Sequence, residues 1–291
     1  MMELPLKAKI LNVPRLIFRN RLMEAVLFSV TNGKSWDELA ARLPANYYQY
    51  PKGSWRNVNR GGFNYHLDIS DYMQWLIYFG IRAEPREILY SLIKPGMNVL
   101  DIGANIGETS MAFSKLAGIT GSIFSFEPDP ETFACLSNHL AMNACTNVTP
   151  VNKGLGKEEG EMLLEEGENN SGGNRIAPGK HVDKGKKITV TTLDKFSALV
   201  SIKKIDFIKI DVEGYEYHVL QGAEETINKH RPSFFIELVD DFLKDQGSSA
   251  KQLVGFLQQK NYSITNANDD SPVSANMNFA DTHFDIIALP L

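Results

Sequence analysis

Cysteine is scarce in this sequence, which has only Cys135 and Cys145. The two residues form neither a Cys-x-x-Cys pair nor any other zinc-type spacing, and the six histidines show no metal-ligand spacing. The pattern indicates two reduced thiols rather than a disulfide framework. We therefore expect a cytoplasmic protein with no metal site.

Long apolar runs are also lacking. No stretch approaches the ~18–20 residues that a membrane-spanning helix needs. Near the N-terminus, Lys7, Lys9 and Arg15 interrupt the apolar residues and spoil the core of a signal peptide. The sequence therefore predicts no membrane span and no signal peptide.

Positive charge is not in excess, because 30 Lys and Arg residues face 35 Asp and Glu residues. Proteins that bind nucleic acid neutralise its phosphates with clustered Lys and Arg. The one basic stretch, 180–187, is interrupted by Asp183 and is typical of a solvated loop. We therefore expect no nucleic-acid partner.

What the sequence does contain is a regular alternation of apolar runs and helical segments from residue 94 onward. This alternation predicts an α/β fold, with a mostly parallel sheet and helices on both faces. The expected strands are 98–102, 122–126, 148–152, 207–210, 233–238, 262–265 and 284–289; the expected helices are 108–116, 131–142, 216–228 and 250–259.

The first 93 residues follow a different pattern and predict a helical and hairpin extension. Helical segments occupy 10–45, 71–79 and 85–93, and a hairpin of 54–58 with 63–67 turns at Gly61-Gly62. We expect two domains, 1–93 and 94–291, and any oligomer contact to use the first. Six aromatic residues of the extension either stack on an acceptor or simply pack its helices: Tyr47, Tyr48, Tyr50, Trp55, Phe63 and Tyr65. Between strand candidates 161–164 and 188–192, the polar loop 165–185 is a second candidate for the acceptor site.

The turn Asp101-Ile102-Gly103-Ala104-Asn105-Ile106-Gly107 joins a strand to a helix and is the first candidate for a ligand site. Backbone N–H groups at a helix N-terminus favour polar or anionic ligand groups. Glycine is needed where φ is positive, and asparagine is the best substitute, as at Asn105. A P-loop is absent, and a dinucleotide fingerprint would need glycine at Asn105 and Glu108. The turn therefore favours a methyltransferase, in which Asp101 faces the methionine end of the cofactor.

Two further groups of charged residues end later strands. Glu127-Pro128 ends the next strand, where a carboxylate binds ribose hydroxyls or, alternatively, caps a helix. Lys209, Asp211 and Glu213 alternate at the end of another strand, and period-2 spacing predicts that they share one side. They indicate a reaction site or, alternatively, a capping cluster for the helix that follows.

With these motifs the sequence resembles the FkbM-type methyltransferase family. The residues that carry the resemblance are Leu100 to Gly107, Phe126-Glu127-Pro128, Thr192-Leu193-Asp194, Ile208 to Glu216, Val219 to Ala223, Pro232 and Glu237.

The resemblance implies a class I methyltransferase fold with a Rossmann-like sheet of seven strands, one of them antiparallel. It also implies S-adenosyl-L-methionine as the cofactor and methylation of a hydroxyl on a sugar, glycan or secondary metabolite. The cofactor residues would be Asp101, Gly103, Ala104, Asn105 and Gly107, Glu127 with Pro128 at the ribose, and Asp211.

Methyl transfer to a hydroxyl benefits from a general base. Asp211 or Glu213 is the candidate, within a catalytic group that includes Lys209, and His218 is the runner-up. The alternative function is a non-catalytic protein of the same fold that binds the cofactor or a partner, and the failed fingerprint disfavours an NAD-dependent enzyme.

Overall fold

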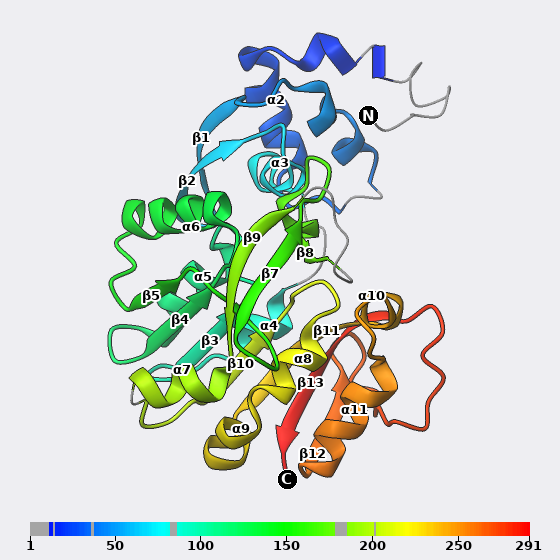
Figure 1. Cartoon of the computed structure of the whole chain (residues 1–291). Helices are drawn as coiled ribbons and strands as arrows, with labels where there is room; N and C mark the ends of the chain where they lie inside the picture. The colour runs from blue at the N-terminus through cyan, green and yellow to red at the C-terminus, as the bar shows by residue number, and fades with distance from the viewer. Residues whose placement is uncertain (1–11, 14, 36–37, 82–85, 178–184, 201) are drawn as a thin grey trace. The chain divides into compact units, whose positions relative to one another are not determined.

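The computed structural model describes residues 12–13, 15–35, 38–81, 86–177, 185–200 and 202–291 (Figure 1). The chain divides into two compact units, Met1–Arg86 with Gly167–Gly172, and Glu87–Glu166 with Gly173–Leu291. The expected domains, 1–93 and 94–291, stay a prediction. None of the described helices is long and apolar enough to cross a membrane.

Among its described residues, the first unit contains two α-helices and a hairpin. The expected hairpin is confirmed, and Asp71 caps the following helix by accepting a hydrogen bond from Gln74 N. The Asp71 carboxylate also accepts hydrogen bonds from the backbone and hydroxyl of Ser171, which ties 167–172 to this unit. Its elements are η1 Leu16–Phe18, α2 Arg21–Thr31, η2 Leu39–Arg42, η3 Tyr47–Gln49, β1 Trp55–Arg60, β2 Phe63–Asp68 and α3 Tyr72–Phe79; η4 Ser171–Gly173 ends in the second unit.

A seven-stranded sheet forms the centre of the second unit, which confirms the predicted fold class. Its strand order is β12-β13-β11-β10-β3-β4-β5; β13 pairs antiparallel with both β12 and β11, and the other four neighbouring pairs are parallel. The strands are β3 Asn98–Ile102, β4 Ser122–Phe126, β5 Val148–Val151, β10 Phe207–Ile210, β11 Ser233–Val239, β12 Tyr262–Asn266 and β13 His283–Pro290.

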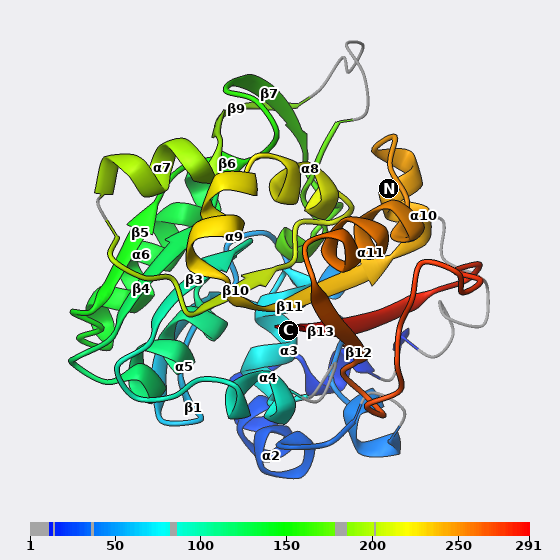
Figure 2. The ribbon, with the colours of Figure 1, turned by 90° about the horizontal axis from the view of Figure 1, so that it is seen from below.

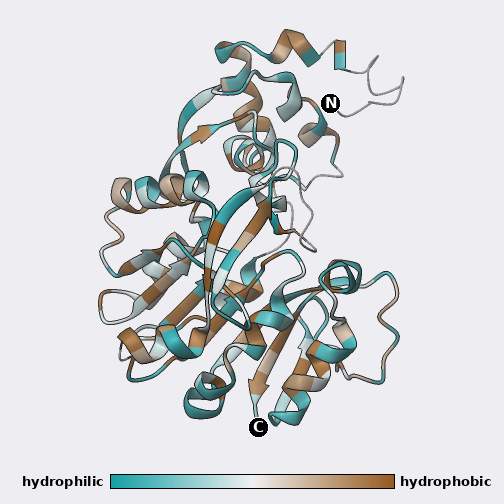
Figure 3. Ribbon diagram, in the orientation of Figure 1, coloured by the Kyte–Doolittle hydropathy of each residue, from teal (hydrophilic) through white to brown (hydrophobic). Residues whose placement is uncertain are grey.

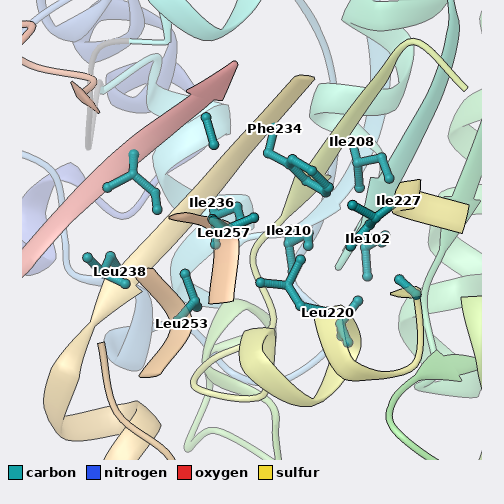
Figure 4. Close-up of a cluster of buried hydrophobic side chains, with 14 of the residues drawn as sticks. Ile102, Ile208, Ile210, Leu220, Ile227, Phe234, Ile236, Leu238, Leu253 and Leu257 are labelled. Atoms are coloured by element: carbon teal, nitrogen blue, oxygen red, sulfur yellow. The ribbon is translucent and has the colours of Figure 1, made fainter. Parts of the chain in front are cut away.

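Helices cover both faces of this sheet (Figure 2). A hydrophobic core lies on each face of the sheet. Alternate side chains of β3 enter one core or the other, because successive residues of a strand point to opposite faces. Leu100 and Ile102 pack with α7, α8, α9 and α11, whereas Val99 packs with α4 and α5. Figure 4 shows part of the first core, with Ile102 beside Leu220 of α8 and Ile227 of α9. The helices are α4 Glu87–Ser91, α5 Glu108–Ala117, α6 Pro130–Met142, α7 Leu193–Val200, α8 Glu216–Gln221, α9 Glu224–His230, α10 Asp240–Asp245 and α11 Ala250–Gln259. Figure 3 shows the apolar character of the central strands.

The middle of the chain forms a separate four-stranded sheet of order β6-β9-β7-β8. Its strands are β6 Gly154–Leu155, β7 Gly160–Glu165, β8 Arg175–Ile176 and β9 Lys186–Thr191. The sequence predicted β7 and β9 but not the two short strands. Part of the expected loop 165–185 is therefore ordered by pairing, and residues 178–184 lie outside the described part of the chain.

The single helix expected over 216–228 is wrong, because α8 ends before Gly222 and α9 begins at Glu224. A residue far away in the sequence caps the N-terminus of α9. The Asp194 carboxylate accepts hydrogen bonds from the backbone N–H groups of Glu225, at 3.1 Å, and Thr226, at 2.7 Å. A tertiary contact of this kind is invisible to local sequence patterns.

Candidate active site

Three polar side chains form a row across the middle of the sheet. Ser125 of β4, Asp101 of β3 and Lys209 of β10 are register partners, and all three are buried. Asp101 Oδ2 accepts hydrogen bonds from Ser110 Oγ, at 2.5 Å, and Thr109 Oγ1, at 2.7 Å. Its other oxygen, Oδ1, lies 3.6 Å from Lys209 Nζ. A buried carboxylate is tolerated when it is paired and hydrogen-bonded, as it is here.

The turn after β3 has the backbone conformation that its glycines and asparagine predict. The φ angles are +79° at Gly103, +47° at Asn105 and +94° at Gly107. A Cβ atom on Gly103 would overlap the backbone oxygen of Asp211. Glycine is therefore required at position 103 both by the angle and by the close approach of the neighbouring chain.

Two buried oxygen atoms at this turn have no hydrogen-bond donor among the described residues. They are Oδ1 of Asp101 and Oδ1 of Asn105. A buried acceptor without a donor costs free energy, so native proteins rarely keep one unless it serves a purpose. The turn thus offers two acceptors to a ligand with donor groups.

Glu127 follows β4 and connects the turn after β3 with the segment after β4 through hydrogen bonds. Its Oε2 accepts a hydrogen bond from Asn105 N at 3.0 Å, and its Oε1 accepts one from Asp129 N at 2.9 Å. Burial raises the pKa of Glu127 to about 7. Asp129, not Glu127, is the N-cap of α6, which removes the capping alternative. The adjacent Pro128 accepts a hydrogen bond from Asn152 Nδ2 through its carbonyl, at 3.1 Å.

The segment after β10 is a turn rather than a continuing strand, so the expectation of strand spacing up to Glu213 is wrong. The strand ends at Ile210, and Glu213 has a φ of +54°. Lys209 Nζ donates to Gly103 O at 2.9 Å and lies 3.1 Å from Asp211 Oδ2. The ammonium group therefore fixes both the turn after β3 and the carboxylate of Asp211.

The turn still brings carboxylates together, and one of them was missed as a site residue. Side-chain oxygens of Asp211, Glu213 and Glu237 lie within 4.8 Å of one another. Glu237 lies on β11, the neighbour of β10, so sheet order rather than sequence distance brings it here. Divalent cations use such carboxylate groups, and the expectation of no metal site stays a prediction.

The pKa of Glu213 is raised to about 9. Burial is the largest cause, followed by the like charges of Glu237, Asp211 and Glu216, whereas Arg175 lowers it. Neither Asp211 nor Glu213 caps the helix that follows, because the N-cap of α8 is Tyr215 and makes no side-chain cap hydrogen bond. Glu216, the first residue of α8, instead accepts hydrogen bonds at Oε1 from two N–H groups of the preceding turn, Val212 N and Gly214 N, both at 3.0 Å. Glu216, rather than Asp211 or Glu213, therefore stabilises the turn after β10.

Most of the remaining candidates have a structural explanation, and Trp55 is the exception. His218 Nε2 lies 2.9 Å from Gln246 O, so the backbone engages its ring. In the N-terminal unit, Tyr50 and Tyr65 are buried, whereas Trp55 is 42% exposed. Packing therefore accounts for these tyrosines but not for the tryptophan.

A family model described as the methyltransferase FkbM domain matches residues 101–264, more than half of the chain. The hexuronic acid methyltransferase AglP of Haloferax volcanii is 30% identical over 130 residues, which cover 44% of this chain and 50% of the relative. The 2-O-methyltransferase NoeI of Sinorhizobium fredii is 30% identical over 159 residues, 50% of this chain and 65% of the relative.

The chain thus spans half the length of the first of these relatives. Among solved structures, the methyltransferase FkbM of Methylobacillus flagellatus aligns with 75% of this chain and 55% of its own, at 18% identity and a TM-score of 0.45.

Proposed function

The chain belongs to the FkbM methyltransferase family, and from that premise we propose that it transfers the methyl group of S-adenosylmethionine to a hydroxyl of a sugar or glycan. The observation that carries the proposal is the position of the Asp101–Lys209 row. Asp101 and Lys209 are each the last residue but one of their strands, so the row lies at the carboxyl edge of the sheet. It lies beside the turn whose buried acceptors lack a hydrogen-bond donor among the described residues and beside the carboxylate cluster. Ligands of open α/β sheets bind at that edge.

The residues present suit the cofactor. Asn105 Oδ1 and Asp101 Oδ1 are buried acceptors for the donor groups of the methionine portion, and Gly103 lets the backbone turn without a side chain. Glu127 keeps lone pairs for ribose hydroxyls beside the two backbone hydrogen bonds that it accepts. When bound, S-adenosylmethionine supplies an electrophilic methyl group.

The carboxylate cluster supplies the proton acceptor. A hydroxyl is a weak nucleophile until it loses its proton, so a base at the acceptor raises the rate. Asp211 is engaged by Lys209, whereas Glu213 has a raised pKa. We assign the base role to Glu213, whose pKa is raised first by burial and then by the like charge of Glu237. Lys209 acts as a positioning residue, because it holds Asp211 and Gly103.

The acceptor class rests on the chemistry of the cluster and on the relatives. Carboxylates at the carboxyl edge of the sheet accept hydrogen bonds from a polyol, which a sugar provides. One relative is described as acting on hexuronic acid and another as a 2-O-methyltransferase. The direct test is a screen of sugars and hydroxylated metabolites for methyl incorporation from labelled cofactor.

Thermal unfolding in the presence of candidate ligands tests whether the chain binds S-adenosylmethionine. S-adenosylmethionine and its demethylated product should each raise the midpoint of thermal unfolding, because both bind the folded chain only. NAD and ATP should leave the midpoint unchanged. The absence of a shift with both methionine ligands would refute the proposal, whereas a shift without methyl incorporation into any acceptor would favour a non-catalytic binding protein.

Cofactor affinity should also depend on pH through Glu127. The ionised carboxylate is the better acceptor for two hydroxyl donors, and its pKa is about 7. We expect the dissociation constant to rise as pH falls below about 7, by up to about tenfold per pH unit, and to level off above it. Calorimetric titrations from pH 5.5 to 8.5 measure this, and Glu127→Gln should remove the dependence. Equal slopes in both proteins would contradict the assignment.

A further inference from the structure

The β1–β2 hairpin exposes one face that is rich in amides. Cross-strand pairs on this face are Asn57 with His66 and Asn59 with Asn64. Asn57 Oδ1 lies 2.7 Å from His66 Nδ1, and Asn59 Nδ2 donates to Asn64 Oδ1 at 3.0 Å. An amide group offers both donors and an acceptor, which is the pattern that neighbouring sugar hydroxyls require.

An aromatic surface adjoins these amides. The Trp55 ring stacks on the His66 ring, with centroids 4.8 Å apart and an angle of 5° between the planes. Trp55 is nevertheless 42% exposed. A flat, partly exposed indole held in place by a stacked neighbour suits the apolar face of a pyranose ring, since aromatic side chains combine a large apolar area with few rotatable bonds.

A cavity of about 300 Å³ opens beside this face, which is the lower end of the size range of small-molecule sites. It lies wholly within the N-terminal unit. Residues of α2, both hairpin strands and α3 line it: Arg21, Trp55, Arg56, Asn57, His66 and Tyr78.

The charge balance of the cavity is positive. Arg56 is neutralised by the buried Glu24, through Nε–Oε2 at 2.8 Å and Nη2–Oε1 at 3.0 Å. Arg21, the first residue of α2, is exposed and has no acidic partner among the described residues. The only carboxylate of the hairpin, Asp68, already accepts hydrogen bonds from Gly53 N and from Ser70. Arg21 therefore supplies an uncompensated guanidinium.

We propose that the cavity and the exposed hairpin face form a binding site for an acidic saccharide, with its ring on Trp55, its hydroxyls on the asparagines and its carboxylate on Arg21. A guanidinium binds a carboxylate through two parallel hydrogen bonds. This site is built from the N-terminal unit alone and goes beyond the proposed methyl transfer.

Titration calorimetry on the full chain, without cofactor, tests the site with a galacturonic acid trimer as the probe. We expect the acidic trimer to bind, and a neutral galactose trimer to bind at least about tenfold more weakly, which is 1.4 kcal/mol. Trp55→Ala and Arg21→Ala should each weaken the acidic trimer about tenfold or more. Arg42→Ala is the matched control, because Arg42 is an exposed arginine of the same unit that does not line the cavity, and it should bind as the native chain does.

Several results would overturn the proposal. These are no binding of the acidic trimer, equal binding of the neutral trimer, native affinity in both variants, or equal binding of a polyglutamate of the same charge. The Arg21 side chain is exposed and makes no hydrogen bond or ion pair with another described residue, so Arg21→Ala stays informative even where Trp55→Ala lowers stability. Because the cofactor is absent from the titration, failure here is separate from failure of methyl transfer.

Discussion

Gly103→Ala is expected to abolish cofactor binding and to lower the free energy of unfolding by at least about 3 kcal/mol. The added Cβ would overlap Asp211 O, and the backbone angle of +79° is unfavourable for alanine. The turn must shift to relieve the overlap and the unfavourable angle, and this shift displaces the Oδ1 atoms of Asp101 and Asn105 that we expect the cofactor to contact. Chemical denaturation and cofactor titration of the purified variant measure the two effects.

Gly247→Ala is the matched control for this experiment. Gly247 also has a positive φ, of +75°, but a Cβ there meets no atom within 4 Å. We expect it to cost only about 1 kcal/mol, from the backbone angle alone, and to bind the cofactor normally. If Gly103→Ala behaved like Gly247→Ala, the close approach of the β10 turn to position 103 would not be a constraint.

Glu213→Gln is expected to lower kcat for methyl transfer by about 10²–10⁴, the contribution of a general base, with little change in cofactor affinity. In the native chain the base works only when deprotonated, and its pKa is about 9. The rate should therefore rise about tenfold per pH unit up to about pH 9 and then level off. The variant should lose this rising limb.

Glu237→Gln distinguishes the effect of Glu237 on the pKa of Glu213 from the role of Glu213 as the base. Removing the like charge of Glu237 should lower the pKa of Glu213, so the rising limb should move to lower pH while the plateau rate is kept. Glu225→Gln, at an exposed glutamate of α9, should leave the profile unchanged. Full turnover in Glu213→Gln would remove the base assignment, and a comparable loss in Asp211→Asn would transfer it to Asp211.

The sequence predicted the local features of this site because each depends on neighbouring residues. The strands 98–102, 122–126 and 207–210 have the bounds expected from their apolar runs. The positive φ angles at Gly103, Asn105 and Gly107 follow from residue types that alone adopt them readily. The alternation of strands and helices was enough to predict the parallel sheet.

Features that depend on strand order or on distant contacts needed the tertiary structure. Glu237 reaches Glu213 only because β11 pairs with β10, and their proximity together with burial raises the pKa of Glu213. Asp194 caps α9 across the chain and so divides a helix that looks continuous in the sequence.

The sequence by itself determined the family, the turn and the carboxylates at the strand ends, because motifs and periodicity are properties of neighbouring residues. The tertiary structure decided which carboxylate is buried beside another, which one caps a helix and which aromatic ring stays exposed. Electrostatic and packing energies depend on the surroundings in space, and the order of residues along the chain does not specify these.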